Sequence, residues 1–293
     1  MITVIGATGN TGREITLRLL RDGHQVRALG RSAQKLAEVA DAGAETRVGD
    51  VADPAFLTEA FHDADAAYAM LPTDPTWSDV RAEVGRFGEA IVAAARTSGI
   101  RHLVVLSSLG AELATDTGFI TTLYDQEQRL ATLDTNVLLL RPGLFFESFL
   151  PALEVIRHEG MNCDAAAPNV PVPMVAARDV AVVAASALAA RDWQGTVVRE
   201  VLGERDLTYA EVTAIIGARL GKTDLPYVQL PYADMAALLT SVGMSADAAR
   251  LHVGMMRALN EQRIGPREGR SAANSTPTSF EEFADGLAAA YQV

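Results

Sequence analysis

Short apolar runs alternate with amphipathic stretches along the first half of the chain. The runs predict strands, and the stretches between them carry apolar residues at helical spacing. Each strand thus leads through a helix to the next strand, which is typical of a parallel sheet with helices on both faces. The predicted strands are Ile2–Ile5, Gln25–Leu29, Thr46–Val48, Ala66–Met70, His102–Leu106 and Val137–Leu140. The predicted helices are Gly12–Asp22, Ala33–Ala42, Pro54–Phe61, Ser78–Ser98 and Ile120–Leu133.

Beyond Arg141-Pro142-Gly143 this alternation loosens. A polar stretch over residues 265–278 predicts a loop before the last helix. The other predicted elements are a strand over Val197–Leu202, helices over Ala176–Ala190, Thr208–Leu220 and Ala246–Gln262, and a last helix capped by Ser279. We therefore expect an α/β unit over residues 1–150 and a smaller, mostly helical lobe over residues 151–293. Residues 170–200 are candidates for returning to the first unit.

The charge balance argues against direct contact with nucleic acid. The 293-residue chain carries 25 Lys and Arg against 37 Asp and Glu, a net charge of −12, and shows no local basic patch. The one cysteine, Cys163, excludes an internal disulfide framework and fits a reducing compartment, so we expect a cytoplasmic protein. Five scattered histidines show no metal-ligand spacing. The sequence shows neither the apolar run of a membrane span nor a signal-peptide pattern.

A glycine-rich loop joins the first predicted strand to the first predicted helix. It reads Gly6-Ala7-Thr8-Gly9-Asn10-Thr11-Gly12. Glycines in this context permit a tight turn and close approach of a pyrophosphate to the helix N-terminus. Thr8, Asn10 and Thr11 can add side-chain hydrogen bonds. The loop therefore predicts a dinucleotide site.

The residue type after the second strand indicates which dinucleotide binds. Sites that prefer NAD usually place a carboxylate there, to accept a hydrogen bond from the ribose 2′-hydroxyl. Here the chain reads Gly30-Arg31-Ser32, and the next carboxylate is Glu38. A guanidinium suits the 2′-phosphate of NADP(H). Arg31 therefore predicts NADP(H) as the cofactor, unless it is a solvated surface arginine.

Together with further motifs, this loop resembles the NmrA-like family of atypical short-chain dehydrogenases/reductases. The other motifs are Val26–Arg31, Gly49-Asp50, His102–Ser108, Leu140–Gly143 and Phe146-Glu147. That family includes NADPH-dependent quinone reductases, dye reductases, and regulators that bind dinucleotide without turning it over. The resemblance implies an α/β fold: a Rossmann-type, doubly wound parallel sheet followed by a smaller, mostly helical C-terminal substrate lobe.

The resemblance also assigns roles to individual residues. Asp50 and Val51 would meet the adenine, and Leu71 and Pro72 would line the ribose and nicotinamide. Ser107 and Ser108 would lie beside the nicotinamide. The substrate would meet Phe145, Phe146 and Trp77, although surface packing of Trp77 is the alternative. Before the last predicted helix, Arg263, Arg267 and Arg270 would form either a lid over an anionic ligand or a solvated segment.

One departure from related enzymes bears on catalysis. Short-chain dehydrogenases usually carry Tyr-x-x-x-Lys, but Tyr124 is followed four residues later by Gln128. The lysine of the NmrA-like pattern precedes the glutamate that corresponds to Glu127, and Leu123 stands in its place. Tyr124 is therefore a candidate proton donor without its usual lysine, or a wall of the pocket.

Two functions remain open at this stage. One is an NADPH-dependent oxidoreductase whose small-molecule acceptor is quinone-like or otherwise conjugated, because a hydroquinone anion can take its proton from water whereas an alkoxide needs a general acid. The other is an NADP(H)-binding sensor that contacts a protein partner without turnover. The missing lysine favours the sensor, and the aromatic residues that could wall an apolar pocket favour the enzyme.

Overall fold

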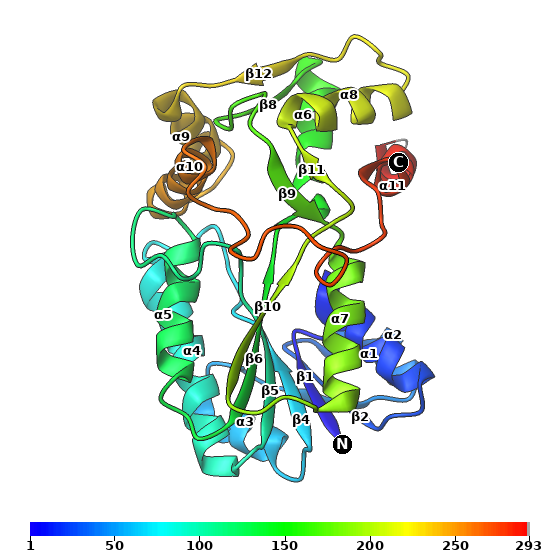
Figure 1. The fold of residues 1–293 in the computed structure, drawn as a ribbon, viewed down its shortest axis with the longest axis vertical. Helices are drawn as coiled ribbons and strands as arrows, with labels where there is room; N and C mark the ends of the chain where they lie inside the picture. The colour runs from blue at the N-terminus through cyan, green and yellow to red at the C-terminus, as the bar shows by residue number, and fades with distance from the viewer. Residues whose placement is uncertain (292–293) are drawn as a thin grey trace.

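A seven-stranded parallel sheet lies at the centre of the computed structural model, which describes residues 1–291 (Figure 1). The strand order is β10-β6-β5-β4-β1-β2-β3. The strands are β1 (Ile2–Ile5), β2 (Val26–Gly30), β3 (Glu45–Val48), β4 (Ala66–Ala69), β5 (His102–Leu106), β6 (Asn136–Pro142) and β10 (Thr196–Val201). All four residues of β1 and all four of β4 are buried, because helices cover both faces of the sheet.

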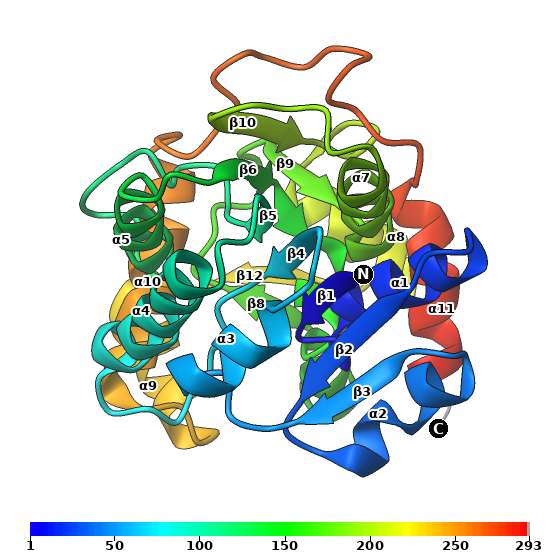
Figure 2. The same cartoon turned by 90° about the horizontal axis from the view of Figure 1, so that it is seen from below.

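Two sets of helices cover the two faces, as Figure 2 shows. One set is α1 (Asn10–Arg21), α2 (Ala33–Asp41) and α7 (Ala177–Ala190). The other set is α3 (Pro54–Phe61), α4 (Val80–Ser98) and α5 (Ile120–Leu130). Side-chain caps fix several starts: the Asp79 carboxylate accepts a hydrogen bond from the backbone N–H of Ala82, 2.9 Å away, and so begins α4.

The strand order reverses beside β1, which lies between β2 and β4. In open α/β sheets the carboxyl ends of the strands form a crevice at this switch point, where ligands bind. The sheet, its helices and its order confirm the predicted Rossmann-type, doubly wound fold. The strands and helices predicted for the first half of the chain all exist, with ends that differ by a few residues.

The C-terminal lobe lies above the carboxyl end of the sheet in Figure 1. Its helices are α6 (Ala152–Glu159), α8 (Tyr209–Arg219), α9 (Tyr232–Ser241), α10 (Ala246–Asn260) and α11 (Phe280–Tyr291), after a 3-10 turn η1 (Phe146–Phe149). Its strands form two small sheets: β11 (Asp206–Leu207), β9 (Val172–Val175) and β7 (Leu144–Phe145), and β12 (Tyr227–Gln229) with β8 (Asn162–Asp164). The sequence pattern did not predict α6, α9 or these short strands.

The chain enters this lobe and comes back to the sheet. Helix α7 packs against α1, and β10 pairs in parallel with β6 at the sheet edge. Residues 177–201 therefore complete the first unit, whereas α8 to α11 belong to the lobe. The division of the chain at residue 150 stays a prediction.

Two absences hold for residues 1–291. No helix there has both the length and the apolar character needed to cross a membrane. Within the same residues, no group of three or more His, Cys, Asp and Glu side chains is arranged to hold a metal ion.

Candidate functional site

The glycine loop turns between β1 and α1 and leaves the start of α1 open. Gly6 has φ +73°, and its carbonyl accepts a hydrogen bond from the N–H of Gly9 at 2.9 Å. A Cβ at Gly12 would collide with the Gly6 carbonyl, so Gly12 is required by the loop itself. A Cβ at Gly9 would meet nothing closer than the same oxygen at 3.5 Å.

This open space suits a phosphate. Gly9 precedes α1 and supplies no side-chain cap to the first helical amides. Free amides and the positive end of the helix dipole attract anions. A side chain at Gly9 would project into the space that such a group needs. The residues present therefore fit the pyrophosphate of a dinucleotide.

A second feature of the same sheet edge is a cavity of about 410 Å³ beyond β2 and β3. It is lined by Arg31, Gly49, Asp50, Ala52, Trp77, Glu83, Arg86 and Phe87. The ring of Trp77 stacks on that of Phe87, with centroids 5.7 Å apart and planes at 23°. Asp50 is held in place because its carboxylate accepts a hydrogen bond from the N–H of Ala52 at 2.9 Å. The cavity thus joins two predicted cofactor residues, Arg31 and Asp50.

Trp77 was expected beside the substrate, with packing as the alternative. It lines this cavity with Arg31 and Asp50 and stacks on Phe87, and its contact with a substrate stays a prediction. The sequence also missed Glu83 and Arg86, which pair on α4 at 2.7 Å. Their spacing is typical of an ordinary surface ion pair, so nothing in the sequence singled them out.

The other residues expected near the dinucleotide follow the ends of strands β3 and β4. Val51 follows β3 and is partly buried against the core under α3 and α4. Leu71 is buried and Pro72 half-buried, directly after β4, which pairs with β1. Their strand ends place them on the same carboxyl edge as the glycine loop.

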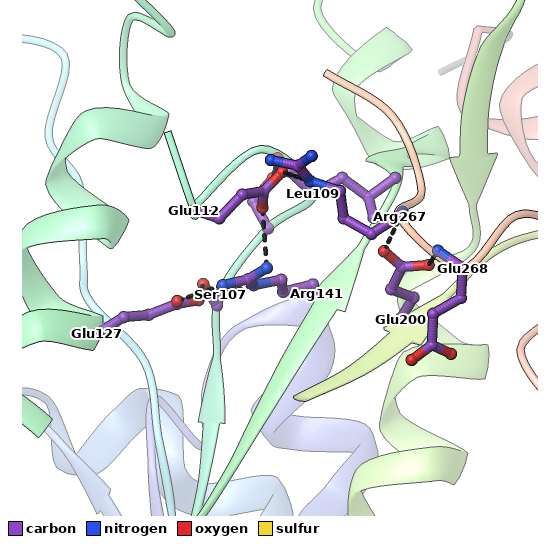
Figure 3. A network of polar contacts seen from close by, with 9 residues as sticks. Ser107, Leu109, Glu112, Glu127, Arg141, Glu200, Arg267 and Glu268 are labelled. Carbon is purple, nitrogen blue, oxygen red and sulfur yellow. Dashed lines mark hydrogen bonds and ion pairs between the residues drawn. The ribbon is translucent and has the colours of Figure 1, made fainter. Parts of the chain in front are cut away.

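Ser107, directly after β5, belongs to a buried polar network (Figure 3). Its hydroxyl donates a hydrogen bond to Glu127 Oε1 at 2.5 Å. Arg141 donates two hydrogen bonds to the same carboxylate, Nε to Oε1 at 3.0 Å and Nη2 to Oε2 at 2.6 Å. Glu127 and Arg141 are each 8% exposed. Buried charges need such pairing, so Glu127 holds Ser107 and is itself held by Arg141.

The network continues outward to the loop of residues 265–278. Arg141 also donates to Glu112 at 2.8 Å, and Glu112 accepts from Arg267 Nε at 2.8 Å. On β10, Glu200 accepts a hydrogen bond from the backbone N–H of Arg267 at 2.6 Å (Figure 3). The loop is therefore tied to the sheet by this chain's own charges.

The two other arginines of this region are engaged in the same way. Arg270 contacts Asp206 and the Gly203 carbonyl, and Arg263 lies 3.8 Å from Asp116. All three guanidinium groups thus have partners within the chain, which favours a pinned loop over a lid that awaits an anionic ligand.

A small apolar cavity lies between the end of β5 and helix α10. Its volume is about 40 Å³, enough for a small number of waters. The lining residues are Ser108, Leu109, Ile120, Pro142, Gly143, Leu144, Val172, Pro173, Met255, Leu259 and Ile264. Ser108 is the predicted site residue among them. The cavity is thus placed where an acceptor beside the nicotinamide would lie.

None of the expected aromatic residues is among the side chains that line the cavity of Ser108. Phe146 is 1% exposed, and its ring centroid lies 5.0 Å from that of Phe280 and 5.6 Å from that of Phe283. It is a core residue of the lobe, so its expected contact with a substrate gains no support from this burial and stays a prediction. Phe145 is half-buried and packs against the sheet. Tyr124 is half-buried, and its hydroxyl makes no hydrogen bond within residues 1–291.

Comparison with known proteins identifies the family and the fold of the chain. A reductase of (4-alkanoyl-5-oxo-2,5-dihydrofuran-3-yl)methyl phosphate from Streptomyces griseus is 35% identical over 224 residues, 76% of this chain and 74% of that enzyme. An NAD(P)H azoreductase from Xenophilus azovorans is 28% identical over 250 residues, 85% of this chain and 84% of the azoreductase. The structure of an NADPH-dependent quinone oxidoreductase from Escherichia coli superimposes with a TM-score of 0.81 at 24% identity, covering 98% of this chain and 99% of that one. The NmrA-like family pattern matches residues 1–284, and the chain belongs to the NmrA-like family.

Proposed function

We propose that this protein is an NADPH-dependent oxidoreductase that transfers hydride to a quinone-like or other conjugated small molecule. One observation carries the proposal. The open glycine loop, the cavity of Arg31 and the apolar cavity of Ser108 all lie at the carboxyl edge of one parallel sheet. A single extended dinucleotide can therefore span the first two and present its nicotinamide to the third.

The choice of NADPH rests on the cavity of Arg31. Its guanidinium can contact a 2′-phosphate, whereas the guanidinium of Arg86 in the same cavity is paired with Glu83. The nearby carboxylates are already engaged, Asp50 with the N–H of Ala52 and Glu83 with Arg86. Trp77 and Phe87 offer an apolar wall to the adenine.

The nature of the acceptor follows from the groups around Ser108. Bound NADPH supplies the hydride, and the protein supplies position and exclusion of water. Apolar side chains dominate the lining of this cavity, which at about 40 Å³ could receive only the edge of a flat apolar acceptor. The reductases of azo compounds, furanones and quinones found among the similar proteins are named for conjugated acceptors.

A panel of acceptors tests the proposal. We expect NADPH oxidation with quinones, azo dyes or unsaturated lactones, and none with simple ketones. NADPH affinity should be measured on the same sample by isothermal titration calorimetry. Tight NADPH binding without oxidation by any acceptor would overturn the enzyme and favour the sensor, which the lack of lysine at Leu123 and Gln128 also allows.

A further inference from the structure

A histidine–carboxylate pair lies apart from the network of Ser107, on the helix that walls the apolar cavity. His252 of α10 places Nε2 3.1 Å from Oδ1 of Asp164, the last residue of β8. The carboxylate is fixed by the N–H of Ala165, which donates to the same oxygen at 2.6 Å. The two side chains are 19% and 18% exposed. The pair is therefore ordered, and solvent still reaches it.

Helical geometry places His252 on the face of α10 that lines the cavity. Met255 and Leu259 both line it. With about 3.6 residues per turn, positions three and seven residues after His252 lie on the same side as His252. The rise from His252 to Met255 is about 4.5 Å. The backbone of His252 therefore lies about one turn of helix from Met255, which lines the cavity.

The partner strand runs along the same wall. Asn260 of α10 donates to the carbonyl of Ala165 at 2.9 Å and accepts from the N–H of Ala167 at 2.6 Å. The chain then continues to Val172 and Pro173, which line the cavity. Asp164 and His252 thus lie on two segments that each continue to residues lining the apolar cavity.

His252 lies on a partly exposed side of α10. Gly254 and Met255 are also partly exposed, whereas Ala248, Leu251 and Met256 are 0%, 6% and 1% exposed. Nδ1 of His252 makes no hydrogen bond within residues 1–291, so it is available to a ligand that reaches this side of the helix.

We propose that His252, oriented by Asp164, donates the proton that completes reduction of the acceptor; this rests on the proposed function. Hydride from the dinucleotide brings two electrons and one hydrogen to the acceptor and leaves a negative charge on its oxygen or nitrogen. The Nδ1–H bond of the imidazolium breaks, and a new O–H or N–H bond forms. The neutral imidazole keeps Nε2–H on Asp164 and regains its proton from water.

The role predicts a graded dependence on acceptor chemistry. A hydroquinone anion is weakly basic and can be protonated by water, whereas the enolate left by a conjugated enone is more basic and depends more on a positioned acid. His252→Gln should lower kcat for an enone about a hundredfold and for a quinone much less, with unchanged NADPH affinity. His158→Gln, on an exposed histidine beside Glu154, is the control and should change neither.

Chemical rescue distinguishes a proton-donating role of His252 from a purely structural contact between β8 and α10. Imidazole added to His252→Ala should restore much of kcat without changing the melting temperature of the variant. Losses that are equal for all acceptors and unaffected by imidazole would overturn the proposal. If His252→Ala fails to fold, Asp164→Asn provides the second test, since it should lower kcat for the enone more than for the quinone.

A binding measurement keeps the proposal testable without turnover. In the presence of NADP⁺, 4-nitrophenol should bind as the phenolate, read from its absorption spectrum, and His252→Gln should weaken this binding at least about tenfold. Equal binding by the variant, or no phenolate binding by the unaltered protein, would contradict the proposal. Phenolate binding through His252 without NADPH oxidation would instead contradict the proposed reductase.

Discussion

At the scale of single residues, we propose that Arg31 selects NADPH over NADH. It lines the cavity beyond β2, and a charge-assisted contact with a 2′-phosphate contributes about 1.5–3 kcal/mol. Arg31→Ala should therefore weaken NADPH binding about tenfold to a hundredfold and leave NADH binding nearly unchanged, as measured by calorimetry. Arg86→Gln in the same cavity is the matched control, with a smaller loss because Glu83 already binds its guanidinium. Equal affinity of the unaltered protein for NADPH and NADH would disprove the assignment.

Substitutions at two glycines of the loop should distinguish an effect on dinucleotide binding from an effect on stability. A side chain at Gly9 has room in the protein but occupies the phosphate space, whereas one at Gly12 collides with the Gly6 carbonyl. Gly9→Val should keep its melting temperature and lose dinucleotide binding. Gly12→Val should lower the melting temperature as well. Normal NADPH binding by Gly9→Val would show that the loop does not cradle phosphate.

Tyr124 carries a simpler expectation. Its hydroxyl has no hydrogen-bond partner within residues 1–291, and lysine is absent from both expected positions. Tyr124→Phe should therefore cost far less than the roughly 10²–10⁴-fold that follows loss of a positioned general acid. Steady-state kinetics with a quinone check this. A thousandfold fall in kcat with unchanged NADPH affinity would make Tyr124 the proton donor after all.

At the scale of elements, the network of Glu127 and Arg141 joins α5 to the ends of β5 and β6. Removing one partner of a buried pair costs about 3–5 kcal/mol, and Glu112 offsets part of that for Arg141. Glu127→Gln should thus lower the free energy of unfolding by about 3 kcal/mol in urea denaturation. Asp125 lies on α5 with Glu127 and pairs with Arg81 of α4 in a more exposed position. Asp125→Asn breaks this pair and should cost less than about 1 kcal/mol. Similar losses for the two variants would show that burial does not strengthen the network.

The elements of the first half were predictable because each carries a strong pattern. Strand β1 is continuously apolar, and α1 places Ile15 and Leu19 on one buried face. The lobe was harder to predict, since strands such as β11, with two residues, are too short to show a period. Their pairing is fixed by contacts with distant segments, and no local signal records it.

The site was predictable to the same extent. The glycine loop and Arg31 are local motifs with a physical reason for their spacing. The positions of Trp77, Glu112 and Arg267 depend on how loops far apart in the sequence fold over the sheet edge. His252 and Asp164, separated by 88 residues, meet only because β8 lies beside α10.

At the scale of the whole molecule, two cavities lie at the carboxyl edge of the sheet, one beyond β2 and β3 and the other between the end of β5 and α10 of the lobe. We propose that the dinucleotide occupies the first and that the acceptor meets the nicotinamide at the second. The loop of residues 265–278 crosses between the sheet and the lobe (Figure 1) and is held by Glu112 and Glu200. Direct hydride transfer from the dinucleotide to the acceptor is the activity that we propose.

The most direct test of that claim is a single-turnover measurement with NADPH deuterated at the transferred position of its nicotinamide ring. The protein with bound deuterated NADPH is mixed with a quinone, and the absorbance of the reduced nicotinamide is followed. We predict that this absorbance decays more slowly than with unlabelled NADPH, because direct hydride transfer to the acceptor breaks the labelled bond. If bound NADPH is not consumed by a quinone, an azo dye or an unsaturated lactone, the account of this protein as a reductase is contradicted.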